Sequence, residues 1–324
     1  MKSRIIGTGS YLPSKILTNF DLEKMVDTSD EWITTRSGIK ERRIAAGDET
    51  SSTLGIEAAK RALKNAGIKK ENIDLIVVST LAPDYIFPST ACLIQSGLGI
   101  KNSSAFDVIG ACTGFLMALS IADKYVKSGV SKYALVVAAE CVSRFVDWKD
   151  RNTCVLFGDG AGAAVLTGDK KYGIIGESIY SNGDLSDILC LPGGGGKYPA
   201  SEETLKKRMH YIKMDGTEVY KAAVRTMSET STALLEKTGI KKESIDYFIP
   251  HQANLRIIDS LRKRLNLPLE KVMINVDKYG NTSSATIPIG LDEAVKNNII
   301  KTGDMILMTA AGGGFTYGSM IIKY

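Results

Sequence analysis

The chain carries an internal repeat at a fixed separation of 172 residues. The segment GIKKESIDYFIPHQ, which begins at Gly239, matches GIKKENIDLIVVST, which begins at Gly67. The correspondence runs without a gap from 51–139 to 223–311. Solenoid proteins repeat every ~20 to 50 residues, so this much longer period is not typical of them. It predicts a duplicated domain half.

Each half alternates helices with short apolar strands, so we divide the chain into 1–172 and 173–324. The first half has a helical pattern over 53–67, the strand IDLIVVS, and a second strand, SSAFDVIGAC, which ends at Cys112. A long apolar helix to Gly129 and the strand YALVVAAE follow. The second half repeats this order with IDYFIP, KVMINV, IGLDEAVKNNIIKTG and MILMTAA. Strand, helix and strand in succession predict a layered α/β body with a pseudo-two-fold axis and functional loops beyond the carboxyl ends of the strands.

The composition is typical of a globular protein with a large core. The chain has 324 residues, of which 44% are apolar and 24% are charged. No uncharged apolar run approaches the ~18 residues of a membrane span, and MKSRIIGTGSYLP lacks a signal-peptide pattern. The five cysteines are odd in number without CxxC spacing, and there are only two histidines. We therefore expect a cytoplasmic protein with no metal site and no nucleic-acid or membrane partner.

The two halves differ where equivalent strands end. His251 stands where the first half has Ser79, Cys112 aligns with Ser284, and Asn281 lies three residues before that serine. Cys112 precedes a long helix, whose N-terminal N–H groups and dipole favour a thiolate. A lone cysteine among small residues is more often a packing residue. The set of three at matching strand ends favours a nucleophile instead.

Six motifs, taken in order, resemble β-ketoacyl-acyl carrier protein synthase III over essentially the whole chain. They are TSDEWITTRSGI, GACTGF, FGDGAGAAVL, PHQANLRI, GNTSSA and GGGFTYG. The resemblance implies the thiolase fold, with αβαβα layers built from two similar halves, and a homodimer. It also implies a catalytic triad of Cys112, His251 and Asn281. Elongating condensing enzymes usually have a second histidine in place of Asn281, so the motif favours the initiating type.

The resemblance further implies a decarboxylating condensation. Cys112 would accept an acyl group from acyl-coenzyme A, with the backbone N–H groups of Cys112 and Gly313 as the oxyanion hole. His251 and Asn281 would then stabilise the enolate formed when malonyl-acyl carrier protein loses carbon dioxide. The partners implied are acyl-coenzyme A and acyl carrier protein, and no cofactor is needed.

Binding residues are assigned by the same resemblance. Those expected to contact coenzyme A are Thr28, Trp32, Arg36, Arg151, Gly216 and Asn254. Phe87 matches a residue that reaches across the dimer to bound the partner's acyl pocket. Those expected to meet the carrier protein are Gln252, Arg256, Lys221, Lys263 and Arg264. Without the resemblance, such a charge run is more often a solvated helix face.

Two alternative functions remain open at this point. One is another thiolase-fold condensing enzyme that uses only coenzyme A thioesters, although such chains are usually longer. The other is a catalytically silent acyl-binding protein, against which the complete Cys112, His251 and Asn281 set argues. The sequence does not specify the primer, because Thr113 and Ala311 depart from the residues common in the family.

Overall fold

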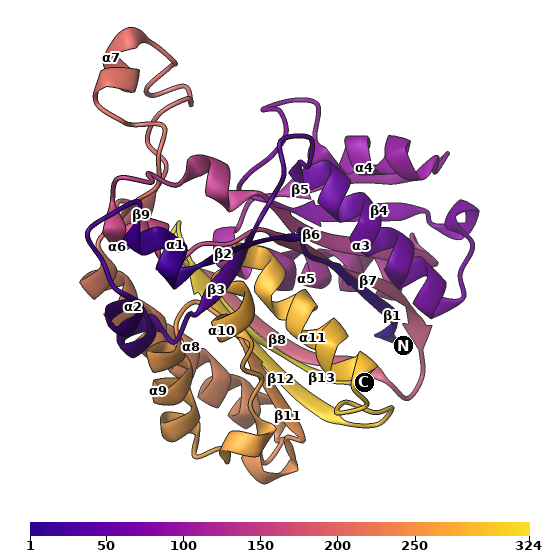
Figure 1. The fold of residues 1–324 in the computed structure, drawn as a ribbon. Helices are drawn as coiled ribbons and strands as arrows, with labels where there is room; N and C mark the ends of the chain where they lie inside the picture. The colour runs from indigo at the N-terminus through magenta and orange to yellow at the C-terminus, as the bar shows by residue number, and fades with distance from the viewer.

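The computed structural model describes residues 1–324 and contains two main β-sheets (Figure 1). The first sheet has the order β1-β7-β6-β4-β5, formed by Lys2–Tyr11, Gly160–Asp169, Tyr133–Glu140, Leu75–Ser79 and Ser104–Val108. The second has the order β11-β12-β13-β8, formed by Tyr247–Pro250, Met305–Gly312, Thr316–Lys323 and Gly173–Ser181. Because every strand of the first sheet precedes every strand of the second, we keep the division after residue 172 as a proposal.

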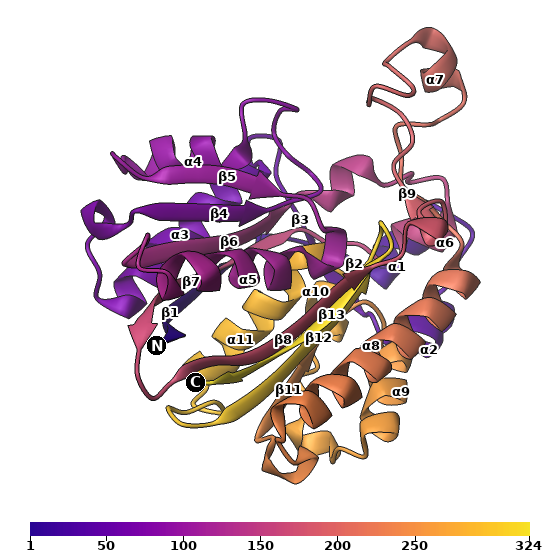
Figure 2. The same cartoon turned by 180° about the vertical axis from the view of Figure 1, so that it is seen from behind.

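Helices form three layers around these sheets, which gives the predicted αβαβα order (Figures 1 and 2). The outer helices of the first sheet are α3 (Ser51–Ala66) and α4 (Thr90–Leu98). Those of the second are α8 (Gly216–Thr238) and α9 (Leu255–Leu265). Between the sheets lie α5 (Gly114–Lys127) and α11 (Thr286–Lys296). The fold is therefore the thiolase-like arrangement that the sequence predicted.

The remaining elements are short and lie around the carboxyl ends of the strands. They are β2 (Lys15–Thr18), α1 (Asn19–Glu23), α2 (Asp30–Ser37), β3 (Glu41–Ile44), α6 (Arg151–Cys154), β9 (Leu189–Cys190), α7 (Glu202–Lys206), β10 (Lys213–Met214) and α10 (Val276–Tyr279). Two 3-10 turns, η2 (Ala111–Thr113) and η7 (Ser283–Ala285), precede the central helices. The segment that carries α7 projects from the body (Figure 2). None of the helices is long and apolar enough to cross a membrane.

The 172-residue repeat is realised element by element. β6 and β12 begin and end at equivalent residues, as do η2 and η7. The helices α3 and α8 also end at equivalent residues, Gly67 and Gly239, with φ of 66° and 68°. This left-handed conformation is the usual helix C-cap and suits glycine, because it has no Cβ. The repeat therefore reflects a duplicated backbone.

Two strand predictions are wrong. KVMINV forms no strand: its only ladder contact is an isolated bridge between Val272 and Phe248, and α10 begins at Val276. The strand predicted to end at Cys112 stops at Val108, so the cysteine lies in the turn η2. Val272 and Val276 of this segment pack in a hydrophobic core without sheet pairing. Strand propensity alone does not distinguish such a buried irregular segment from a strand.

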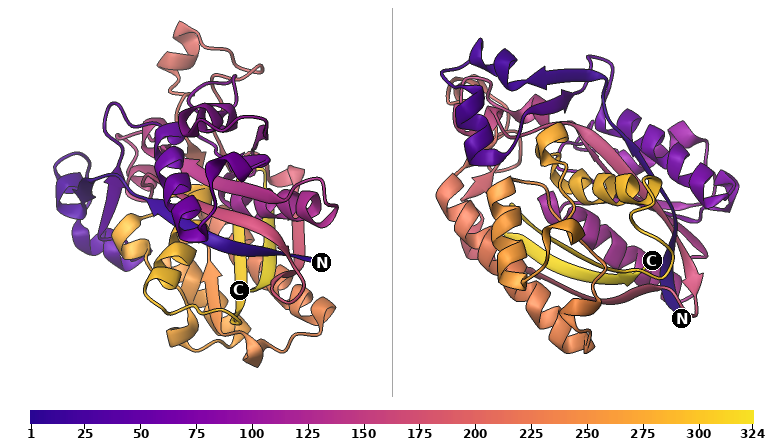
Figure 3. Two further views of the ribbon diagram at one scale, coloured as in Figure 1. Left: turned by 90° about the vertical axis from the view of Figure 1, so that its right-hand side faces the viewer. Right: turned by 60° about the horizontal axis from the view of Figure 1, so that its bottom comes forward.

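The chain termini lie together at one end of the sheets (Figure 3). Lys2 at the start of β1 faces Asp169, the last residue of β7. Lys323 at the end of β13 faces Met305, the first residue of β12. The other end of β12, Gly312, packs against Cys112. The termini are therefore at the opposite end of β12 from Cys112.

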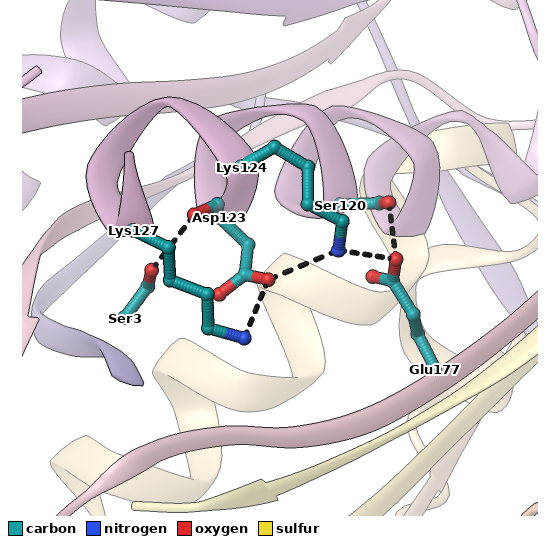
Figure 4. Close-up of polar contacts among 6 residues, drawn as sticks. All are labelled: Ser3, Ser120, Asp123, Lys124, Lys127 and Glu177. Atoms are coloured by element: carbon teal, nitrogen blue, oxygen red, sulfur yellow. Dashed lines mark hydrogen bonds and ion pairs between the residues drawn. The ribbon is translucent and has the colours of Figure 1, made fainter. Parts of the chain in front are cut away.

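A buried carboxylate joins the two halves on the central helix α5 (Figure 4). The Asp123 side chain is 0% exposed, and its Oδ2 accepts hydrogen bonds from Lys124 at 3.1 Å and Lys127 at 2.8 Å. Lys124 also donates to Glu177 Oε1 on β8 at 2.6 Å, as does the Ser120 hydroxyl at 2.8 Å. The two lysines therefore neutralise Asp123, and Lys124 connects it to the second sheet.

Replacing both Lys124 and Lys127 with methionine should destabilise the fold. Asp123 would then be a buried carboxylate without a cation, and we expect the free energy of unfolding to fall by about 2 kcal/mol, between the values for exposed and buried pairs. Urea denaturation measures this loss. The control is Lys206→Met, which removes a pair whose side chains are 80% and 92% exposed. Equal effects of the two changes would contradict the prediction.

Candidate active site

One cleft is lined by the three residues predicted to act together. Cys112 comes from η2, His251 follows β11, and Asn281 precedes η7. The cleft has a volume of about 1080 Å³. The exposed fractions of Cys112, His251 and Asn281 are only 5%, 3% and 7%. The structure thus places a thiol, an imidazole and a carboxamide at the bottom of one cavity.

Cys112 sits on a tight turn that requires small neighbours. The preceding Ala111 has φ of 43°, in the left-handed region that L side chains rarely adopt. A Cβ on Gly312 would lie 2.6 Å from the Cys112 backbone nitrogen, and one on Gly114 would lie 1.9 Å from Ser79 Oγ. Glycine at both positions lets the turn pack against the ends of β12 and β4.

The Cys112 thiol is protonated at neutral pH. Burial raises its pKa to about 12, and a contact of 3.8 Å with Ser283 Oγ opposes that rise. The sequence favoured a thiolate from the position before α5, but burial outweighs that effect here. The thiol therefore has to lose its proton when it reacts.

His251 is held as a neutral side chain. Its backbone N–H donates to Thr309 O at 2.8 Å, and its Nδ1 lies 2.7 Å from Thr286 Oγ1. Burial lowers the pKa of His251 to about 3. The Thr286 hydroxyl has one proton: donated to Nδ1, it leaves the ring proton on Nε2, which then acts as a hydrogen-bond donor, whereas donated to Ser283 O at 3.1 Å, it leaves Thr286 to accept from Nδ1–H. Thr286 thus has the position needed to fix the tautomer.

Asn281 is oriented by its own turn. Its Oδ1 accepts from the Ser283 backbone N–H at 2.8 Å, so its Nδ2 is the group left to donate to a bound molecule. Its backbone N–H donates to Leu156 O at 2.9 Å, and its carbonyl accepts from Gly158 N–H at 3.1 Å. These bonds fix Asn281 against the segment that follows α6.

The two amides predicted to form the oxyanion hole have no partner within the chain. Neither the Cys112 nor the Gly313 backbone N–H donates a hydrogen bond. Gly313 follows β12 directly, and a Cβ there would lie 2.8 Å from Leu189 O. Both amides are therefore available to an acceptor, which is a necessary property of an oxyanion hole.

The mouth of the cleft combines an indole with two guanidinium groups. The Cζ atoms of Arg36 and Arg151 lie 4.9 Å and 5.3 Å from the Trp32 ring centroid. These are cation–π distances, so a second aromatic ring can stack between Trp32 and Arg151 only when the arginine moves. Thr28 has a buried hydroxyl with no hydrogen-bond partner. Of these four predicted residues, Trp32 and Arg36 line the cleft.

Gly216 and Asn254 also line the cleft, each at the beginning of a helix. Gly216 is the first residue of α8. Asn254 caps α9, because its Oδ1 accepts from the Arg256 N–H at 2.7 Å. Its Nδ2 donates to Arg36 O at 3.1 Å. Asn254 therefore joins α9 to the helix that carries Trp32.

Four of the residues predicted to meet a carrier protein lie on the adjacent helices α8 and α9. Arg256 and Lys221 line the cleft, with the Arg256 Cζ 5.7 Å from the Tyr220 ring centroid. Lys263 is paired with Asp259 at 2.6 Å, and Arg264 lines a separate groove.

Gln252 is the one predicted docking residue that the structure excludes. It is 0% exposed. Its Nε2 donates to Pro250 O and Met273 O, and its Oε1 accepts from the Asn275 N–H. Its prediction as a docking residue is wrong, because all its polar atoms bond to the backbone.

Phe87 lies in an exposed apolar patch. Its exposed fraction is 85%, and the neighbouring Tyr85 and Ile86 are 61% and 85% exposed. Ile109, which follows β5, is 80% exposed. Large apolar side chains exposed together are typical of a protein–protein interface.

Glu140, Ser283 and Ser284 are the site residues that the sequence did not indicate as functional. The Glu140 carboxyl is 0% exposed and lies beside the turn that carries the two serines. The only signal was its alignment with Gly312 in the repeat. The structure contains no group of three or more histidine, cysteine or acidic residues arranged to hold a metal ion.

Comparisons with known proteins agree with this geometry. Residues 106–183 and 235–324 match the family described as 3-oxoacyl-[acyl-carrier-protein] synthase III and its C-terminal part. The β-ketoacyl-[acyl-carrier-protein] synthase III of Caldanaerobacter subterraneus is 54% identical over 321 residues, 99% of this chain and 97% of the relative. The chain belongs to the β-ketoacyl-acyl carrier protein synthase III family.

Solved structures of the synthase III family have the same fold. The Aquifex aeolicus structure is 52% identical, with a TM-score of 0.93, and the match covers 99% of this chain and 100% of that chain. The Thermus thermophilus structure is 41% identical, with a TM-score of 0.92 and 99% of each chain covered. The resemblance drawn from the six motifs is thereby confirmed.

Adding one methyl group at Gly312 should disable Cys112. The Cβ of Gly312→Ala would lie 2.6 Å from the Cys112 nitrogen and 2.9 Å from its Cβ, so the turn has to shift. We expect acylation of Cys112 by acetyl-coenzyme A to slow about 100-fold, since small displacements of reacting groups cost that much. Intact-protein mass spectrometry measures the rate. Gly195→Ala is the control, because a Cβ there meets nothing within 4 Å. Unchanged acylation in Gly312→Ala would contradict the placement.

Proposed function

We propose that this protein condenses a short acyl-coenzyme A primer with malonyl-acyl carrier protein and so starts fatty acid synthesis, with Cys112 as the nucleophile. The carrying observation is the buried cleft in which Cys112, His251 and Asn281 meet, on a chain that belongs to the synthase III family. No separate observation favours a synthase that uses only coenzyme A thioesters, or a silent acyl-binding protein.

The first half-reaction is a thioester exchange at Cys112. The sulfur attacks the acyl carbonyl carbon, the bond to coenzyme A sulfur breaks, and the thiol proton ends on the released coenzyme A. Negative charge develops on the carbonyl oxygen during the attack. The unpartnered N–H groups of Cys112 and Gly313 are suited to stabilise it. This step leaves an acyl group on the enzyme.

The second half-reaction uses the neutral donors of the site. Malonyl-acyl carrier protein loses carbon dioxide, and the electron pair of the broken carbon–carbon bond forms an enolate at the thioester. His251 Nε2–H and Asn281 Nδ2–H are suited to stabilise the enolate oxygen. The carbanion attacks the acyl-cysteine and releases the Cys112 thiolate. Because burial lowers the pKa of His251 to about 3, this imidazole stays neutral down to acidic pH.

Coenzyme A fits the mouth of the cleft chemically. It carries an adenine ring and phosphates, for which Trp32, Arg36 and Arg151 supply an aromatic surface and two cations. The buried Thr28 hydroxyl, four residues before Trp32, has no hydrogen-bond partner in the chain. Gly216 and Asn254 would follow the pantetheine arm toward Cys112, since both line the cleft.

Other features complete the proposal. The enzyme is a cytoplasmic homodimer, in which the exposed patch around Phe87 forms part of the interface and Phe87 bounds the acyl pocket of the second copy. It uses no metal or redox cofactor, because each step proceeds by thioester chemistry.

The proposal predicts that Cys112→Ser cannot be acylated. A serine hydroxyl at neutral pH is a far weaker nucleophile than a thiolate, so no acyl adduct should form with acetyl-coenzyme A. Mass spectrometry of the wild type and the variant measures this directly, with a panel of acyl-coenzyme A primers to define the chain length. An adduct on another cysteine would refute the assignment.

Asn281→Ala separates the two half-reactions in the same assay. It should reduce decarboxylation of malonyl-acyl carrier protein about 100-fold or more and leave self-acylation nearly unchanged. Equal loss of both steps would indicate a structural role for Asn281.

Arg256→Glu tests whether the malonyl group is delivered by the carrier protein. Docking of an acidic partner depends on surface charge that salt screens over ~8 to 10 Å. We expect the KM for malonyl-acyl carrier protein to rise about tenfold at low salt, and acylation by acetyl-coenzyme A to change much less. Lys60→Glu, the same charge change on the outer helix α3, is the control. Equal use of malonyl-coenzyme A would refute carrier docking.

A further inference from the structure

Glu140 is a buried carboxyl at the end of β6 that the proposed reaction does not use. Its Oε1 accepts from Ser284 Oγ at 2.6 Å, and its Oε2 accepts from the Leu81 N–H at 3.0 Å and from Thr80 Oγ1 at 3.2 Å. Its side chain forms no ion pair and is 0% exposed. Neutral donors alone therefore hold a carboxyl next to the site, which is costly unless both oxygens are bonded.

These bonds connect the first half to the turn η7, which directly follows the segment of Asn281. Ser284 belongs to η7, and the Ser283 hydroxyl of the same turn lies 3.8 Å from Cys112 Sγ. Ser283 has φ of 51°, a left-handed conformation that its surroundings must hold in place. Glu140 thus fixes, through one turn, both the Ser283 hydroxyl and the segment that orients Asn281.

The repeat shows how Glu140 comes to this place. It aligns with Gly312, just as Ser284 aligns with Cys112 and Ser283 aligns with Ala111. At the Cys112 turn, Gly312 has no side chain, so the cysteine packs against its backbone. At the equivalent turn, the Glu140 carboxyl fills that space, with Oε1 3.4 Å from the Ser284 N–H. In one half the Cys112 turn occupies the space beside this position, and in the other half a carboxyl does.

The carboxyl also affects the thiol through its charge. Burial is the main reason that the pKa of Cys112 is raised; the bond to Ser283 opposes the rise, and the negative charge of Glu140 adds to it. Burial raises the pKa of Glu140 itself to about 7. Apart from Cys112, the titratable group beside Glu140 is the Cys141 thiol. The neighbouring elements contribute no charge: the nearby residues are Ser79 from β4, Gly114 from α5 and the serines of η7.

We propose that Glu140 is a positioning residue for acyl transfer: its carboxyl holds the Ser283–Ser284 turn in place, and that turn keeps the Ser283 hydroxyl beside Cys112. This inference rests on the proposed role of Cys112 as the nucleophile.

Glu140→Gln tests both parts. A carboxamide has one oxygen that accepts and one NH2 group that only donates. The NH2 group would therefore face another donor, either the Leu81 N–H or the Ser284 hydroxyl, and one of these hydrogen bonds is lost. The turn then loosens. We expect kcat for self-acylation by acetyl-coenzyme A to fall at least ~10-fold, because the reacting groups are displaced, with KM nearly unchanged. Removing the charge lowers the pKa of Cys112, so its alkylation by iodoacetamide should shift to lower pH. A shift of the alkylation profile along the pH axis distinguishes this role from general destabilisation, which would expose Cys112 and speed its alkylation at every pH.

Two further variants make the comparison specific. Ser283→Ala removes the hydroxyl that lowers the pKa of Cys112, so its alkylation profile should shift to higher pH, opposite to Glu140→Gln. Asp292→Asn is the matched control. Asp292 is another fully buried carboxylate that bonds across the halves, to Thr8 Oγ1 at 2.9 Å and Ser10 Oγ at 2.5 Å, although it is also paired with Lys296 at 2.6 Å; Asp292→Asn should leave the profile unchanged. Peptide mass spectrometry must follow Cys112 alone, because Cys92 is exposed and also reacts.

The inference is overturned if Glu140→Gln acylates at the wild-type rate, or if its alkylation profile coincides with that of Asp292→Asn. If Glu140→Gln does not fold, Glu140→Asp decides: it keeps the charge and shortens the side chain, so acylation should fall while the profile stays, and full activity would overturn the inference. Failure of the wild type to acquire an acyl group on Cys112 would instead refute the proposed function.

Discussion

The enclosure of the two central helices constrains the rest of the structure. Because α5 and α11 lie between the two sheets, they contribute Phe115, Leu119, Ile287 and Leu291 to one continuous core. Helices packed between two sheets have to be largely apolar, and the charges buried on them need partners, as Asp123 has. Their N-terminal turns, η2 and η7, are then fixed at the junction of the halves. Catalytic groups placed on those turns inherit this rigidity.

Duplication supplied the scaffold, and a few side chains at strand ends made the halves unequal. His251 in place of Ser79, and Cys112 in place of Ser284, put the reactive groups on one side of the pseudo-two-fold axis. The other side is filled by the Glu140 carboxyl and its serine partners. A single cleft results from a backbone that offers two equivalent positions.

Much of this was predictable from the sequence, because the repeat and the apolar strands are local signals. The repeat located Cys112, His251 and Asn281 at matching strand ends, and the structure places all three in one cleft. Gln252 was misjudged because the family resemblance assigned it without information on its burial, whereas its amide bonds to the backbone of two segments. Glu140 was missed because its partners are distant in sequence. Long-range hydrogen bonds of this kind have no sequence period.

The closeness of the chain ends has a consequence for engineering. Lys2 and Lys323 lie at one end of the sheets, and Cys112 packs at the other end of β12. A short linker from Tyr324 back to Met1 would therefore run over a surface remote from the chemistry. New termini could be opened in the projecting segment around α7, where Leu205 is 64% exposed. Such surface sites tolerate circular permutation, so most of the second half can precede the first along the polypeptide while their packing is kept.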